Sequence, residues 1–167
     1  MSHSVLASDI IYLTRTSALA GGCLINHYKI YMTEITDYKS LLTVGKQQSE
    51  PQRFLFVFLQ ASLPDTHKEE DKERFNSGKG AMLEAIMCVD KDLDELTNFE
   101  DLVTESKQME QPWDIVLIAC LSGINGMHPT PEQAEEPLKI MFKTVQNGGS
   151  LSKYLAFNRQ GDLLHFS

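Results

Sequence analysis

The sequence is poor in cysteine and has no long apolar segment. Its 167 residues contain three cysteines, Cys23, Cys88 and Cys120. This low, odd number argues against the disulfide framework of a secreted protein. The longest apolar run, FLFVFL, is far shorter than the roughly 20 residues that a membrane-spanning helix needs. We therefore expect a cytoplasmic protein, in which Cys88 and Cys120 are buried and unreactive because both lie in apolar runs.

Positive charge is also scarce. The chain has 15 Lys and Arg residues against 23 Asp and Glu residues, which gives a net charge of −8. Phosphate backbones and anionic lipid repel an acidic protein, so neither nucleic acid nor a membrane is an expected partner. Hydrophobic residues make up 42% of the chain and charged residues 23%, which is typical of a globular domain.

Sequence motifs of catalysis and metal binding are missing as well. The chain has no C-x-x-C pair, and no glycine-rich phosphate loop follows a predicted strand. His67 has no second ligand at metal-binding spacing. We therefore expect no cofactor and no metal, and we favour a protein that is not an enzyme.

Residues 1–31 differ from the rest of the chain. They carry one acid and two bases, whereas residues 32–167 carry 22 acids and 13 bases. Asp9 and Arg15 interrupt the apolar stretch that a signal peptide requires. We expect this segment to be a disordered extension, or an addition ahead of a natural start at Met32. We expect residues 32–167 to form a single α/β domain.

Helix-start signals mark three segments of that domain. Thr33 precedes residues 34–47, where apolar side chains recur at helical spacing. Capping boxes at Thr97–Glu100 and Thr130–Gln133 begin two more helices, because each pairs a hydroxyl with an acceptor three residues later. Pro131 suits the first position of the third helix.

Apolar runs bounded by polar or turn residues predict the strands. The strongest is RFLFVFLQASL, whose almost continuous apolar character suggests that both faces are covered. Gly161 suits the turn of a C-terminal β-hairpin. The charged run at 65–79 reads as a solvated loop. The predicted strands are Arg53–Leu63, Ala81–Val89, Asp114–Ser122, Tyr154–Phe157 and Leu163–Phe166.

The order of these elements contains two successive strand–helix–strand units. Such units predict a parallel core with right-handed crossovers, to which the last strand adds antiparallel. We therefore expect an α/β fold with a mixed, largely parallel sheet of about five strands. Three to four helices should cover one or both faces of this sheet.

Polar residues follow the predicted parallel strands, and ligands bind beyond the carboxyl ends of such strands. The helix starts at Thr97 and Thr130 should offer N–H groups to an anion at the same edge. The alternative is that these residues only form turns and helix caps. A Cys/His pair of Cys88 or Cys120 with His128 or His165 is a further, less supported option. The candidate ligand-binding residues are Asp90, Lys91, Ser122, Asn125, His128 and Arg159.

Six stretches of the domain resemble a family of small proteobacterial proteins that carries the label "ribonucleotide reductase subunit alpha". They extend over the chain from about Met32 to Ser167. The resemblance implies a small domain of unassigned biochemical role. The stretches are PQRFLFVFLQASLP, MCVDK, LTNFEDLVTES, QPWDIVLIACLSG, PTPEQAEEPL and GGSLSKYLAFNRQG.

The family label implies chemistry that these residues do not supply. It implies a thiyl radical, a redox-active cysteine pair and nucleotide sites in a large barrel. After residue 31 the chain has only Cys88 and Cys120, and they are not closely spaced. We therefore interpret the label as an inherited name rather than a function.

Two classes of function remain. We predict a non-catalytic interaction or regulatory module, which binds an unidentified protein partner or forms a homodimer. The alternative is a small-molecule or anion-binding protein, or a small enzyme, that uses the carboxyl edge of the sheet. A concave pocket containing Asp90, Asn125 and Arg159 would favour the second class, and an exposed apolar patch would favour the first.

Overall fold

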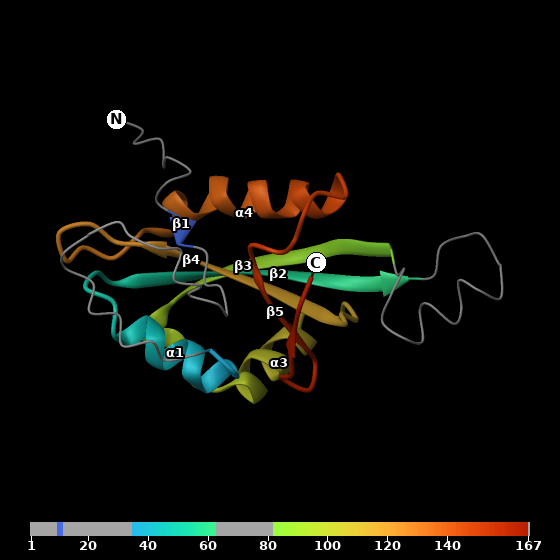
Figure 1. Cartoon of the computed structure of the whole chain (residues 1–167), viewed down its shortest axis with the longest axis horizontal. Coiled ribbons are helices and arrows are strands. Elements are labelled where there is room, and N and C mark those ends of the chain that lie inside the picture. The colour runs from blue at the N-terminus through green and yellow to red at the C-terminus, as the bar shows by residue number, and fades with distance from the viewer. Residues whose placement is uncertain (1–9, 12–34, 63–81, 167) are drawn as a thin grey trace, which may run out of the picture.

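A single sheet forms the middle layer of the domain, with helices on both of its faces (Figure 1). The computed structural model describes residues 10–11, 35–62 and 82–166. Its strands are β1 (Ile10–Ile11), β2 (Gln52–Ser62), β3 (Met82–Asp92), β4 (Ile115–Ser122), β5 (Leu155–Asn158) and β6 (Leu163–Leu164). Its helices are α1 (Tyr38–Lys46), the 3-10 helix η2 (Leu93–Glu95), α3 (Phe99–Lys107) and α4 (Pro131–Gln146).

All strand pairs among these described residues are antiparallel. The strand order is β3-β2-β4-β5-β6, and β1 pairs with β4. The prediction of a mixed, largely parallel sheet is therefore wrong. β3 and β4 do run in the same direction, but β2 lies between them and is antiparallel to both.

The prediction fails because apolar patterns identify strands without identifying their neighbours. β2 is buried on both faces, and this is as compatible with the centre of an antiparallel sheet as with a parallel one. The helix that joins β3 to β4 has the length of a parallel crossover, yet it crosses over an intervening strand. The predicted charged loop at 65–79 lies outside the described residues.

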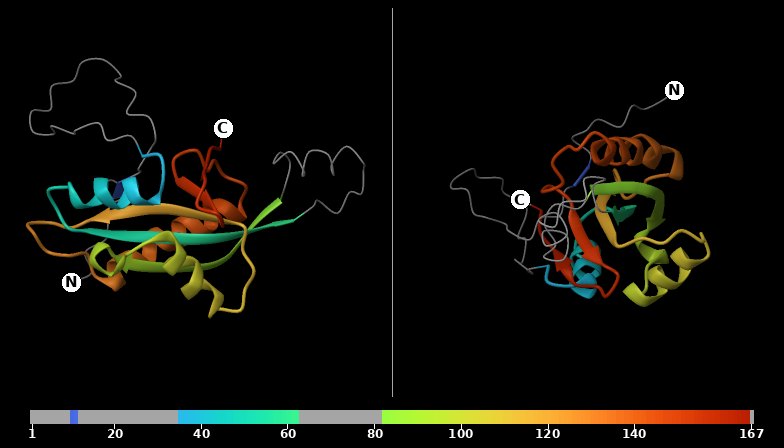
Figure 2. Two further views of the ribbon diagram at one scale, coloured as in Figure 1. Left: turned by 90° about the horizontal axis from the view of Figure 1, so that it is seen from below. Right: turned by 90° about the vertical axis from the view of Figure 1, so that its right-hand side faces the viewer.

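The side chains of β2 alternate between two cores. One face of the sheet packs against α1 and α3, and the other packs against α4 (Figure 2). All side chains from Phe54 to Leu59 are at most 2% exposed, which confirms that both faces of this strand are covered. The phenylalanine face carries Phe54, Phe56 and Phe58, and the leucine face carries Leu55, Val57 and Leu59.

Local hydrogen bonds decide where each helix begins. α1 begins at Tyr38, later than predicted, because the carboxylate of Asp37 caps it. The N-cap of α3 is Asn98 rather than Thr97. Thr130 caps α4 in a capping box, as the sequence predicted.

β1 belongs to the segment that we expected to lie outside the fold. It pairs with β4 at Leu121 and Cys120. β5 pairs with the other half of β4, from Ile115 to Ile118. β1 and β5 therefore lie along the same side of β4. The remainder of residues 1–31 lies outside the described part of the chain.

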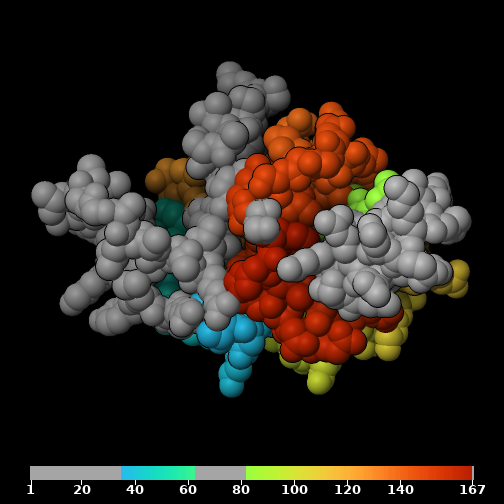
Figure 3. All heavy atoms as spheres, turned by 45° about the vertical axis from the view of Figure 1, so that its right-hand side comes forward, coloured from blue at the N-terminus to red at the C-terminus, as the bar shows by residue number. Residues whose placement is uncertain are grey.

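The predicted C-terminal hairpin is confirmed. β5 and β6 pair across a turn in which Gly161 has a φ of 86°. The side-chain oxygen of Asn158 accepts hydrogen bonds from the backbone N–H groups of Gln160 and Asp162, which fixes the turn. In Figure 3 this C-terminal segment (red) lies beside α4 (orange) and forms one surface with it.

Candidate functional site

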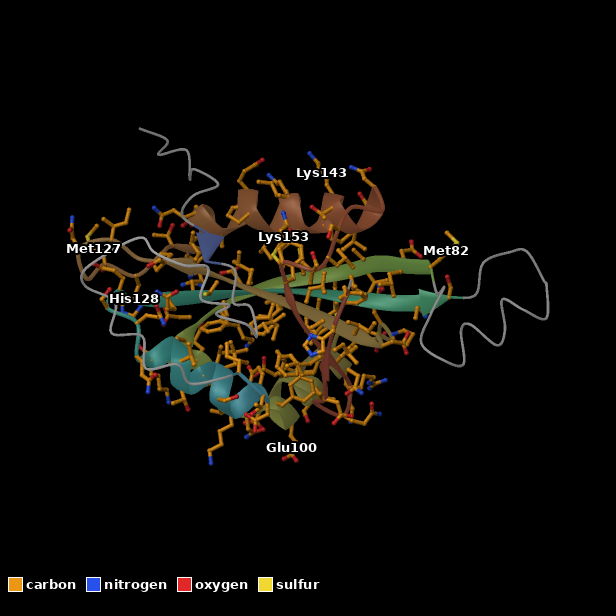
Figure 4. The ribbon with its side chains drawn as sticks, in the orientation of Figure 1. Met82, Glu100, Met127, His128, Lys143 and Lys153 are labelled. Atoms are coloured by element: carbon orange, nitrogen blue, oxygen red, sulfur yellow. The ribbon has the colours of Figure 1, made fainter. Side chains whose placement is uncertain are left out.

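Two of the six predicted site residues, Asp90 and His128, belong to one network of charged and polar side chains where β3 and β4 end, on the leucine face of the sheet. Arg53 Nη1 lies 2.7 Å from Asp90 Oδ2, and Arg53 Nη2 lies 3.9 Å from Asp92 Oδ2. His128 Nδ1 lies 2.7 Å from the same oxygen of Asp92. We call these four residues the Arg53 cluster; Figure 4 shows His128 at this end of the molecule, opposite Met82.

The Arg53 cluster fastens the loop before α4 to the sheet. Arg53 Nε donates a hydrogen bond of 2.7 Å to the carbonyl oxygen of Pro129, and the side chain of Arg53 is only 11% exposed. Asp92 also accepts a hydrogen bond from the backbone N–H of Asp94. The charged groups of the cluster therefore bond to one another and to the backbone, which is the arrangement of a structural ion-pair network.

Sequence reasoning missed two members of this cluster, Arg53 and Asp92. The second strand was expected to end at Val89, whereas β3 continues to Asp92. Asp90 and Asp92 are two residues apart, and side chains at that spacing in a strand share a face. If the predicted strand had been extended from Val89 to Asp92, both acids would have been placed on the leucine face.

Three residues of this region could each offer a ligand atom to a metal ion. One atom each from Asp92, Asp94 and His128 lies within 4.8 Å of the others. However, the guanidinium group of Arg53 lies 3.9 Å from Asp92, so a bound cation would lie close to another positive charge. The geometry fits an ion-pair network better than a metal centre.

Ser122 and Asn125 lie at the same end of the sheet but bond within the fold. Ser122 Oγ accepts a hydrogen bond of 3.2 Å from Gln52 Nε2. Asn125 and Gly126 have φ values of 54° and 75° and form a tight turn. This arrangement matches the alternative in which these residues serve as turn and cap residues.

Lys91 and Arg159 do not join the cluster. Lys91 projects onto the phenylalanine face, where its Nζ lies 2.5 Å from Glu105 Oε2 of α3. Arg159 follows β5, and its guanidinium carbon lies 5.3 Å from the centre of the Trp113 ring, close to the start of β4. The structure therefore separates Arg159 from Asp90, at opposite ends of the sheet.

The two described cysteines differ in exposure. Cys120 is buried as expected, and burial raises the pKa of its thiol to about 12. Cys88 is exposed, contrary to expectation, because β3 lies at the edge of the sheet. Partial burial and the charge of Asp90 raise the pKa of the Cys88 thiol as well. Neither cysteine has the lowered pKa of a nucleophilic thiolate.

A concave apolar groove lies on the phenylalanine face, between β3 and α3. Its volume is about 300 Å³. The ion pair of Lys91 and Glu105 joins the strand to the helix beside it. We call this the β3–α3 groove; it is lined mainly by Phe58, Met87 and Val89 from the sheet and by Leu102, Ser106 and Met109 from the helical side.

Trp113 holds the helical wall of the groove, α3, in place against the sheet. Trp113 Nε1 donates a buried hydrogen bond of 2.8 Å to Ser106 Oγ. The Trp113 ring in turn meets Phe58 edge to face, with 5.0 Å between the ring centres. The groove is therefore formed before any ligand enters it.

β3 is an edge strand, because among the described residues it pairs with β2 alone. Its middle portion, Ala85–Val89, has no charged side chain and lies between Glu84 and Asp90. The register with β2 shifts at this point, which leaves Ile86 as the extra residue of a bulge. An edge of eleven residues offers backbone N–H and C=O groups to another extended chain.

Comparison with known proteins gives no relative. No family model matches the chain, and neither the curated proteins nor the solved structures include a match. The family resemblance therefore stays a prediction. Among the described helices, none combines the length and apolar character needed to cross a membrane.

Proposed function

We propose that this protein is a non-catalytic interaction module that binds an extended segment of another protein in the β3–α3 groove. The segment adds to β3 as a further strand. One observation carries this proposal. Among the described residues, the outer edge of β3 pairs with no other strand, and it lies beside a preformed apolar groove. Addition of a strand to a sheet edge, with side-chain pockets alongside, is an established way of recognising peptides.

The backbone of β3 supports affinity in this proposal. Every second residue of an edge strand points its N–H and C=O groups away from the sheet, and a bound strand satisfies them. The uncharged stretch Ala85–Val89 is the part of this edge where desolvation costs least.

The side chains of the groove support specificity. Met87 and Val89 lie on the phenylalanine face, opposite Phe58 and Phe56 of β2. Alternate side chains of an added strand would lie over the same face, next to these residues and to Met109. Met109 is 59% exposed, so it is free to change rotamer and adapt to an apolar side chain.

A second copy of this chain is a less suitable occupant. Self-pairing of β3 would bring together two edges that each carry three acids, Glu84, Asp90 and Asp92, and only one lysine. Like charges on neighbouring strands repel one another and destabilise a sheet. A segment of a different protein avoids this repulsion, so we favour it over a homodimer.

The first experiment selects ligands for the full chain from a phage-displayed library of random nine-residue peptides. We expect enrichment of peptides with apolar residues at alternate positions. The Met109→Lys variant should weaken their binding by about tenfold or more, since a charge then replaces an apolar contact. The matched control is Met127→Lys, because Met127 is 70% exposed on a distant loop. No enrichment, or equal effects of the two variants, would contradict the proposal.

A second measurement tests strand addition itself. The selected peptide is synthesised in two series, with N-methyl groups on alternate amides of one or the other edge. Only one edge of a strand bonds to β3, so one series should lose binding and the other should keep it. Similar affinities in both series would exclude backbone pairing. Sedimentation of the free protein at high concentration checks for the homodimer, which this proposal does not require.

We also propose a cytoplasmic location. The low and odd number of cysteines, three in 167 residues, supports it, because proteins of oxidising compartments commonly carry paired disulfides. Fractionation of cells that produce the native protein tests this location, and recovery from a periplasmic or secreted fraction would contradict it.

A further inference from the structure

We infer that the β3–α3 groove selects extended segments of net positive charge. The inference rests on the proposed function, since it concerns the class of peptide that the groove accepts. It is drawn from the charged residues that border the groove rather than from the apolar residues that line it.

Carboxylates outnumber lysines in the two segments that border the groove. Residues 82–92 and 99–110, which contain β3 and α3, carry seven acidic side chains and two lysines. Two of these acids, Asp90 and Asp92, lie on the leucine face with Arg53, so the acids that matter for the groove are the remaining five. The whole chain has a net charge of −8, so no distant excess of positive charge offsets the local field. An excess of one sign of charge around a groove attracts ligands of the opposite sign and speeds their association.

The lysine inside the groove is already neutralised. Lys91 Nζ lies 2.5 Å from Glu105 Oε2, and the side chain of Lys91 is only 20% exposed. By contrast, no described residue forms an ion pair with Glu84 or Glu110. These two carboxylates are exposed, and Glu84 lies on the phenylalanine face, because its partner Gln60 lies two residues after Phe58 along β2. Basic residues of a bound segment would therefore meet uncompensated acids.

The positions of these acids also indicate which residues should flank the apolar centre of a bound segment. Glu84 precedes the uncharged stretch of β3, and Glu110 follows Met109 at the rim of the groove. The apolar centre is thus flanked by acids. A complementary segment has an apolar centre with lysine or arginine on its flanks.

Two synthetic peptides test this inference against the full-length protein. Both have the same central sequence of alternating leucine and threonine, and they differ in having two lysines or two glutamates at each end. We expect the lysine peptide to bind about tenfold tighter or more at about 0.05 M salt. The difference should fall to about twofold at about 0.5 M salt, where screening is strong. Fluorescence anisotropy of labelled peptides gives both dissociation constants.

Charge-reversed variants assign the effect to the groove. Glu84→Lys with Glu110→Lys should remove most of the preference for the lysine peptide. The control, Glu135→Lys with Glu136→Lys, makes the same change in net charge on exposed positions of α4, on the other face of the sheet. It should keep most of the preference, since charges further away than a Debye length of about 10 Å are screened.

The outcomes separate this inference from the proposal beneath it. Equal binding of the two peptides at low salt overturns the charge selection and leaves strand addition standing. A preference that both pairs of variants reduce equally also overturns it, because the effect would then belong to the whole molecule. If neither peptide binds at either salt concentration and the library yields none, the proposed function fails and the charge selection fails with it.

Discussion

The hydroxyl group of Ser106 lies between Trp113 and the backbone of its own helix. It accepts a hydrogen bond from Trp113 Nε1 and donates one of 2.6 Å to the carbonyl oxygen of Val103. A single small side chain thereby ties the end of α3 to the residue that leads into β4. Trp113 is 2% exposed, so its indole N–H depends on this partner.

The Ser106→Ala variant should lower the free energy of unfolding by about 1–3 kcal/mol, because it leaves the buried N–H of Trp113 without an acceptor. Urea denaturation followed by Trp113 fluorescence measures the change. Thr104→Ala is the matched control, since Thr104 is exposed on the same helix. A loss of stability no larger than that of the control would show that the hydrogen bond contributes little.

Asp37 should make stability depend on pH in the acidic range. Hydrogen bonds from the backbone N–H and the hydroxyl group of Ser40 lower the pKa of Asp37 below its ordinary value of 3.8. A lowered folded-state pKa stabilises the protein above the unfolded pKa, and this contribution is lost as the pH falls through the folded pKa. We expect the stability of Asp37→Asn to decline less between about pH 5 and pH 2 than that of the parent protein.

Denaturant titrations of the two proteins at a series of pH values test this prediction. Parallel stability curves would mean that Asp37 is not the responsible group. The effect should be small, because the capping carboxylate is exposed to solvent.

The two described thiols should differ in their rates of alkylation. In a Cys23→Ser background, iodoacetamide should modify Cys88 well before Cys120, because Cys88 is exposed and Cys120 is 1% exposed. The rate at Cys88 should rise steeply with pH above about 8.5, since its raised pKa keeps it protonated at neutral pH. Mass spectrometry of proteolytic peptides gives both rates. Fast modification of Cys88 at neutral pH would contradict the raised pKa.

Local structure could largely be predicted from the sequence. The capping box at Thr130 and the turn at Gly161 depend on residues within a few positions of each other, and both are as expected. The position of β2 between β3 and β4 could not be predicted in the same way. It depends on which strands pair, and the side chains of Phe54–Leu59 suit the centre of several sheets.

The candidate site shows the same division. Asp90 and His128 lie at the same end of the sheet and are linked through Arg53 and Asp92, because the carboxyl ends of β3 and β4 do point the same way. Arg159 does not join them, since β5 runs antiparallel to β4 and ends at the other end of the sheet. The β3–α3 groove was not predicted. It depends on how α3 packs against an edge strand, and the sequence does not show which strand lies at the edge. Met109 offers a sequence signal for it, because this apolar residue lies seven positions after Leu102 and continues the helical spacing beyond the end of α3, where it is exposed.

The extra residue at Ile86 sets a limit on how long a recognised motif can be. Beyond this residue the side chains of β3 change phase, so that Ala85 faces the leucine face whereas Met87 faces the phenylalanine face. A regular strand whose side chains share the faces of residues 87–92 would have its side chains on the wrong faces beside residues 82–85. A regular ligand strand therefore matches only one side of Ile86, and a segment that reaches from Asp90 to Glu84 needs a compensating bulge of its own.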